Sequence, residues 1–168
     1  MVKPYQHATK ICTGLTFLAI LGILWGLNSQ NPLIIMLFLS PTILYEVYRT
    51  EGESTKLASW GLLIAFIAEI VFISTGLSFN LAEFLQTDQK MIAGFVVPLG
   101  DIKVVFPIII GIISAILFKR TRGRYTKWLA VIIFVSVFAI IYSIDPDIFT
   151  KLLRLVTQEG LKQVRYSY

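Results

Sequence analysis

The sequence predicts an all-α, polytopic integral membrane bundle of about five transmembrane helices with short interfacial amphipathic helices. The first observation behind this is residues 102–118, seventeen residues whose only charge is Lys103. An apolar run of that length is satisfied by a bilayer or by a large protein core, and 168 residues are too few to supply such a core. We therefore interpret 102–118 as a membrane span.

The second observation is the composition. Hydrophobic residues make up 56% of the chain and charged residues 15%, against about 45–50% and 25% in soluble proteins. The net charge is +5, and the cations cluster at the ends of apolar runs. We expect them to set the topology and to contact the bilayer and its anionic lipid headgroups, with no role in nucleic-acid binding.

The first predicted span is 11–27. Lys3 and Lys10 precede it as in a secretory signal, but no small-residue cleavage site follows, so we expect a retained helix. Gly14, Gly22 and Gly26 recur at multiples of four residues. Small residues at this spacing favour close approach of another helix.

The second and third predicted spans are 33–48 and 57–77. Pro41 is expected to kink the second span, because it removes a backbone hydrogen bond. Glu46 and Arg49, one turn apart near the end of this span, are expected to pair and to reach the membrane interface.

The third span carries Glu69 slightly beyond its midpoint. Because Gly61, Ala65 and Glu69 are four residues apart, we expect Glu69 to face the bundle.

Residues 78–90 are too polar to cross a bilayer, and Asn80 with Glu83 matches a capping box that predicts a short interfacial helix. For 91–101 two alternatives stand. Either a re-entrant stub over 91–97 precedes a span at 102–118, or one long kinked helix extends from about Gly94 to Phe118. A proline and a glycine, Pro98 and Gly100, interrupt the apolar pattern at this point.

The fifth predicted span is 128–144, and an amphipathic tail helix is predicted over 146–159. Asp145 is the expected N-cap of the tail helix, because a proline follows it at the first helical position. Such a helix could lie flat in the headgroup region or dock on a partner subunit.

The distribution of cations predicts the topology. With the N-terminus in the cytoplasm, the cytoplasmic segments hold nine Lys and Arg residues, five of them within 119–127. Five spans then place the C-terminus on the opposite side. The tail's own four cations weaken this agreement.

Glu69 is the first candidate site residue, because a carboxylate at mid-bilayer costs about 2.5–3.5 kcal/mol and needs a partner, a wet cavity or a proton. If the long kinked helix forms, Lys103 lies near the depth of Glu69. If the span begins at 102, Lys103 pairs with Asp101 or a lipid phosphate. An ion or proton site at Glu69, Lys103 and Asp101 and a purely structural role both remain open.

The second candidate site is the basic run, which could bind acidic lipid or an acidic partner. It consists of Lys119, Arg120, Arg122, Arg124 and Lys127. The sequence contains a single histidine and a single cysteine, and no phosphate loop, EF-hand, CxxC or HExxH pattern. We therefore assign no catalytic residues, no metal and no cofactor, and lean against enzyme activity.

Three functions fit these features. The first is a non-catalytic subunit, assembly factor or scaffold of a membrane complex, acting as a homo-oligomer or with other subunits. The second is an oligomeric channel or transporter that uses Glu69. The third is a lipid-binding or lipid-modifying membrane protein, which a headgroup-shaped cavity beside Arg120 or Arg122 would favour and a filled bundle would not.

Overall fold

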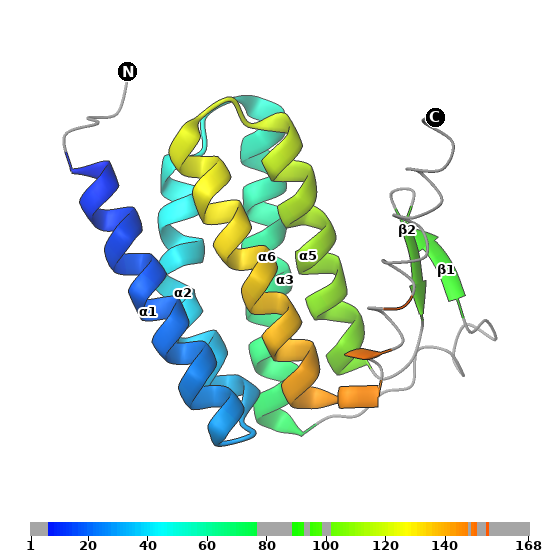
Figure 1. Cartoon of the computed structure of the whole chain (residues 1–168). Coiled ribbons are helices and arrows are strands. Elements are labelled where there is room, and N and C mark those ends of the chain that lie inside the picture. Colours follow the sequence, from blue (N-terminus) through cyan, green and yellow to red (C-terminus); the bar gives the residue numbers. More distant parts are fainter. Residues whose placement is uncertain are drawn as a thin grey trace, which may run out of the picture.

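The apolar runs form helices that stand side by side in a computed structural model of the chain (Figure 1). The structure describes residues 7–76, 89–92, 95–98, 102–147, 149–150 and 154. The elements in these ranges are α1 (Ala8–Asn28), α2 (Pro32–Arg49), α3 (Glu53–Thr75), β1 (Gln89–Ile92), β2 (Phe95–Pro98), α5 (Ile102–Arg120) and α6 (Arg124–Ile144). The predicted helical bundle is confirmed.

Four helical stretches of the described chain are long and apolar enough to cross a membrane. They are Ala8–Asn28, Pro32–Arg49, Thr55–Thr75 and Arg124–Ile144. Helix α5 is not among them, and it carries Lys103 at one end and Lys119 and Arg120 at the other. Large apolar side chains cover the outside of the bundle, including Phe17, Leu37 and Leu57, which are 66–79% exposed. A surface of this kind needs lipid around it, so the chain is a membrane protein.

Helices α1 and α2 pack closely because two of the three predicted glycines lie between them. A Cβ atom on Gly22 would meet the side chain of Phe38, and one on Gly26 would meet Ile35. Gly14 differs, since nothing lies within 4 Å of its Cβ position. The turn that joins the two helices is capped by Asn31, whose side chain accepts a hydrogen bond from Leu33 N at 3.0 Å.

Helix α3 ends at Gly76, which adopts a left-handed conformation with φ of 68°. Lys103, in the first turn of α5, donates a hydrogen bond to the carbonyl of Gly76 at 3.4 Å. A cation at that position also interacts favourably with the negative end of the α3 dipole. Stacked rings of Phe72 and Phe106, 5.4 Å apart between centroids, join the same two helices.

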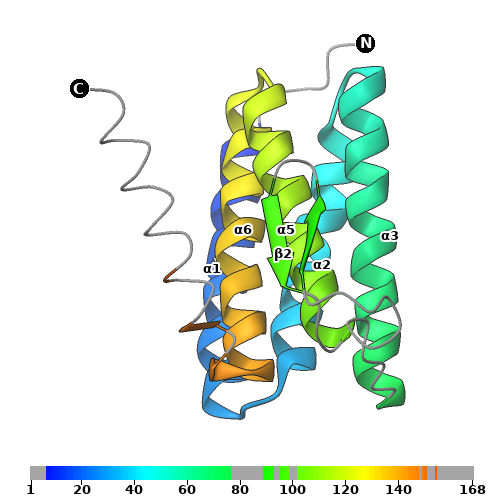
Figure 2. The ribbon, with the colours of Figure 1, turned by 90° about the vertical axis from the view of Figure 1, so that its right-hand side faces the viewer.

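The long kinked helix from Gly94 is wrong. Residues 89–92 and 95–98 pair as antiparallel strands, with Gln89 opposite Pro98. The physical reason is local: Pro98 has no N–H, restricts the residue before it to extended geometry, and follows two β-branched valines. Of the two alternatives, the structure agrees with a separate segment before α5, and this hairpin lies beside α5 in both views (Figures 1 and 2).

The segment after α6 begins as expected. The carboxylate of Asp145 accepts a hydrogen bond from Asp147 N at 2.9 Å, which confirms the predicted cap. The ring of Phe149 then packs edge-on against Phe138 and Tyr142 of α6. Most of the predicted tail helix over 146–159, and the whole predicted interfacial helix near Asn80, lie outside the described residues.

Candidate functional site

A pocket of about 520 Å³ lies at one end of the bundle, between the α2–α3 turn and the α5–α6 turn. Both turns are at the same end as the start of α1 (Figure 1), because successive helices run in opposite directions. The lining residues are Arg49, Glu51, Gly52 and Thr55 on one side and Arg120, Thr121, Arg122, Gly123, Tyr125 and Thr126 on the other. Three arginines from two separate turns therefore surround one cavity.

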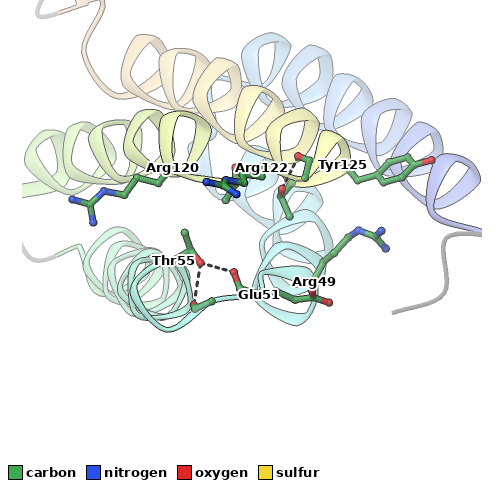
Figure 3. Close-up of a pocket in the computed structure, with 10 residues that line it drawn as sticks. Arg49, Glu51, Thr55, Arg120, Arg122 and Tyr125 are labelled. Atoms are coloured by element: carbon green, nitrogen blue, oxygen red, sulfur yellow. Dashed lines mark hydrogen bonds between the residues drawn. The ribbon is translucent and has the colours of Figure 1, made fainter. Parts of the chain in front are cut away.

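The arginines of the α5–α6 turn occupy the middle and one edge of the pocket. Figure 3 shows Arg122 between Arg120 and Arg49, with Glu51 on the facing turn. Arg120 and Arg122 are exposed, and neither makes a hydrogen bond or ion pair with another described residue. The guanidinium of Arg122 lies in the middle of the lining residues, whereas the Arg120 side chain extends outward at the edge of the pocket (Figure 3).

Arg49 is fixed in place by aromatic groups. Its guanidinium carbon lies 4.8 Å from the centre of the Tyr125 ring, and Nη1 donates to the Tyr45 hydroxyl at 3.3 Å. The Tyr125 hydroxyl in turn shares a 2.8 Å hydrogen bond with Thr9 Oγ1. Tyr125 therefore joins the ends of α1, α2 and α6 at the mouth of the pocket.

Threonines shape the two turns that face the pocket. Thr55 Oγ1 donates to the carbonyl of Glu51 at 2.6 Å, and Thr121 Oγ1 donates to that of Leu117 at 2.6 Å. Thr126 Oγ1 donates to Gly123 O at 2.8 Å. All three threonines are nearly buried. Because their hydroxyls bind the chain's own carbonyls, they fix the turns that carry the arginines.

The five cations of the predicted basic run do not form one site. Arg120 and Arg122 line the pocket, whereas Arg124 is exposed outside it. Lys127 lies 5.6 Å from the centre of the Phe118 ring. Lys119 borders a smaller groove of about 270 Å³ between α5 and α6. The rest of that groove is formed by Ser114, Ala115, Phe118, Ala130, Val131 and Phe134.

The sequence interpretation missed Arg49 and Thr55 as members of this site. Arg49 was expected only to lie at the interface beside Glu46. The signal that could have identified it is topological: two helices, α3 and α5, lie between the end of α2 and the end of α5, so both of these ends lie at the same end of the bundle (Figure 1). Which residues converge there depends on packing between helices distant in sequence.

Glu69 is fully buried, which agrees with its predicted orientation toward the bundle. Lys103 forms its hydrogen bond at Gly76, at the end of α3. Glu69 lies seven residues before Gly76, which is about 10 Å along the helix at 1.5 Å per residue. Since α5 begins at Ile102, the premise that placed Lys103 at mid-depth is wrong. Asp101 lies outside the described residues, and an ion site at Glu69 stays a prediction.

A second buried carboxylate, Glu46, was assigned the wrong environment. We expected its side chain to reach the interface one turn from Arg49, but it is fully buried between helices. One of its oxygens, Oε2, accepts a hydrogen bond from Thr50 Oγ1 at 2.8 Å. Packing of α2 against α3 buries this face, and the sequence of α2 alone does not contain that information.

The fold and its apolar surface define the class of this protein as a small helical membrane bundle. No protein-family model, curated protein or solved structure matches the chain.

Proposed function

We propose that this membrane protein binds anionic lipids, holding a phosphate-bearing headgroup in the pocket between the two turns, and that it does so without catalysis. The observation that carries the proposal is that Arg49, Arg120 and Arg122, from two separate turns, all line one cavity. Its volume of about 520 Å³ lies within the usual range for small-ligand sites, about 300–1,000 Å³. The cavity thus has room for a headgroup.

Charge and geometry favour a phosphate as ligand. A guanidinium offers planar, paired donors that match phosphate oxygens, and it stays charged at every physiological pH. The pocket holds three such groups and one carboxylate, Glu51, which is exposed and therefore screened by solvent. The net charge of the residues that line the pocket is therefore positive, which suits an anionic ligand.

The neighbouring groove supports a lipid in preference to a free phosphate. It is lined by apolar and small side chains, and Lys119 at its edge is followed directly by Arg120 of the pocket. An acyl chain could lie in the groove while its headgroup reaches the arginines. One ligand would then satisfy both an apolar and a cationic surface.

This proposal includes a topology. We propose that α5 is a fifth crossing, since its 19 residues reach about 28 Å and it packs between α3 and α6. The end that carries the pocket would be cytoplasmic, together with the N-terminus, and the C-terminus would lie on the opposite side. Anionic lipids are concentrated in the cytoplasmic leaflet, where such a pocket would meet them.

A channel through the single chain is less well supported. Leu62, Ile110 and Ile133 fill the space between helices of the described bundle and are fully buried. A role within a larger assembly is compatible with lipid binding. Gly14 and Gly61 leave open space at their Cβ positions, which would let another membrane helix approach.

The test is lipid binding by purified protein in mild detergent, followed by native mass spectrometry. Phosphatidic acid and phosphatidylglycerol are compared with phosphatidylcholine. We expect the anionic lipids to be retained preferentially. The double variant Arg120→Gln, Arg122→Gln should lose about 100-fold or more in affinity, since hydrogen bonds to charged groups contribute about 1.5–3 kcal/mol each.

The matched control is Arg124→Gln, Lys127→Gln, which removes the same charge from the same basic run but outside the pocket. We expect its affinity to stay within about threefold of wild type, as for surface charges screened by solvent. Equal losses in both double variants would show that general surface charge binds the lipid. No preference for anionic lipid in the wild type would overturn the proposal altogether.

A further inference from the structure

A group of buried oxygens lies between α2 and α3, deeper in the bundle than the pocket. Thr42, Glu46 and Ser59 are each 0% exposed. Thr42 Oγ1, Glu46 Oε1 and Ser59 Oγ make no close hydrogen bond among the described residues, although the Ser59 hydroxyl is near enough to the Glu46 carboxyl to interact with it. Buried polar atoms are nearly always fully paired, so this incompletely paired group suits a small polar ligand.

The two hydroxyls differ from most others in this bundle. Serines and threonines within the helices or directly after them commonly donate to a carbonyl one turn back, as Thr16, Thr50, Thr121 and Ser136 do. Thr42 and Ser59 do not, and the only further buried hydroxyl of this kind in the described chain belongs to Ser143, on α6. Their hydroxyls are thus available to something other than the backbone.

The three oxygens are close to one another in the fold. Ser59 on α3 faces the carboxyl of Glu46 on α2. Thr42 precedes Glu46 by four residues, one turn or about 6 Å along the same face of the helix. The second carboxyl oxygen of Glu46 is already bound by Thr50. Oε1 is thus the carboxyl oxygen that Thr50 does not bind.

We propose that Thr42, Glu46 and Ser59 bind a monovalent alkali cation, for which sodium is the probe. The set is made of hard oxygen donors, which suit alkali and alkaline-earth ions. It contains one carboxylate, so an ion of charge +1 leaves the buried site neutral. A divalent ion would leave an uncompensated charge in a low-dielectric interior.

This site is separate from the lipid pocket, but the two are connected through the end of α2. Thr50, which binds Glu46 Oε2, is followed directly by Glu51 and Gly52 of the pocket lining. A cation held between α2 and α3 would strengthen the interface that carries that turn. The proposal does not depend on lipid binding, because its test uses only neutral lipid.

The experiment is a sodium titration of the full chain in phosphatidylcholine nanodiscs, with choline chloride keeping the ionic strength constant. Thermal unfolding and retained ²²Na⁺ are measured. We expect a saturable rise in Tm of about 5–10 °C at a sodium concentration a hundredfold above Kd. Ser59→Ala should weaken sodium binding about tenfold, and Glu46→Gln should abolish the response because it removes the charge.

Glu69→Gln and Ser143→Ala are the controls, one for the other buried carboxylate and one for the other unbonded hydroxyl. Both should keep the full sodium response. The proposal is overturned if the wild type shows no response, or if the response persists in Glu46→Gln. A wild type stabilised by acid but not by sodium would identify a proton as the occupant and would also overturn it. If Glu46→Gln does not fold, the binding measured for Ser59→Ala decides.

Discussion

Gly26→Leu is expected to destabilise the bundle by about 3 kcal/mol, near the upper end for an overpacked interface. Even the first side-chain atom would overlap Ile35 Cγ1, and the backbone nitrogen of Ile35 is only 3.2 Å from the same position. A side chain can rotate away, but the backbone of α2 cannot move without separating the two helices. We expect Tm in detergent to fall by about 6–12 °C.

The control for this prediction is Gly14→Leu in the same helix. Nothing lies within 4 Å of the Gly14 Cβ position, so a leucine side chain there enters open space. It should be neutral or slightly stabilising, because leucine favours a helix over glycine by about 0.5–1 kcal/mol. Similar losses of Tm in both variants would mean that α1 and α2 do not pack at Gly26 as described.

The helices of this bundle were predictable because their apolar runs are long. The predicted spans at 11–27, 33–48 and 128–144 correspond to α1, α2 and α6, each of which begins one to four residues earlier than expected. Hydrophobicity locates the part of a helix that lies in lipid. It does not locate the polar first turns, such as the one at Glu53 that opens α3.

The hairpin before α5 was not predictable in the same way. Residues 91–97 are apolar, and a short apolar run fits a strand or a helix equally well. The pairing of Gln89 with Pro98 joins residues that no periodic pattern relates. Pro98 was the better guide to this stretch, because proline has no backbone N–H and disfavours a continuous helix through its position.

The candidate pocket shows the same limit. The run from Lys119 to Lys127 was identified from sequence, but only Arg120 and Arg122 of that run line the cavity. The third arginine, Arg49, comes from a turn some seventy residues earlier. Local sequence gives the charge of a turn, whereas the cavity exists only because the ends of α2 and α5 and the starts of α3 and α6 lie at one level.

Glu69→Lys is expected to cost about 3–5 kcal/mol, the loss typical of an uncompensated buried charge. Glu69 is fully buried, and Leu62, Ala65 and Phe66 of the same helix are buried in the core with it. An ammonium at this fully buried position would lose its hydration, which is costly for a charged group. We expect Tm to fall by about 10 °C or more and the folded fraction in size-exclusion chromatography to drop.

Glu69→Gln separates charge from shape in this prediction. It keeps the length and most of the hydrogen-bonding capacity of the side chain, so its cost should stay within about 1.5 kcal/mol. A Glu69→Lys protein as stable as wild type would contradict the buried environment. It would mean that position 69 borders water inside the bundle. That result would favour the hypothesis of an ion or proton path through Glu69, which a filled core does not support.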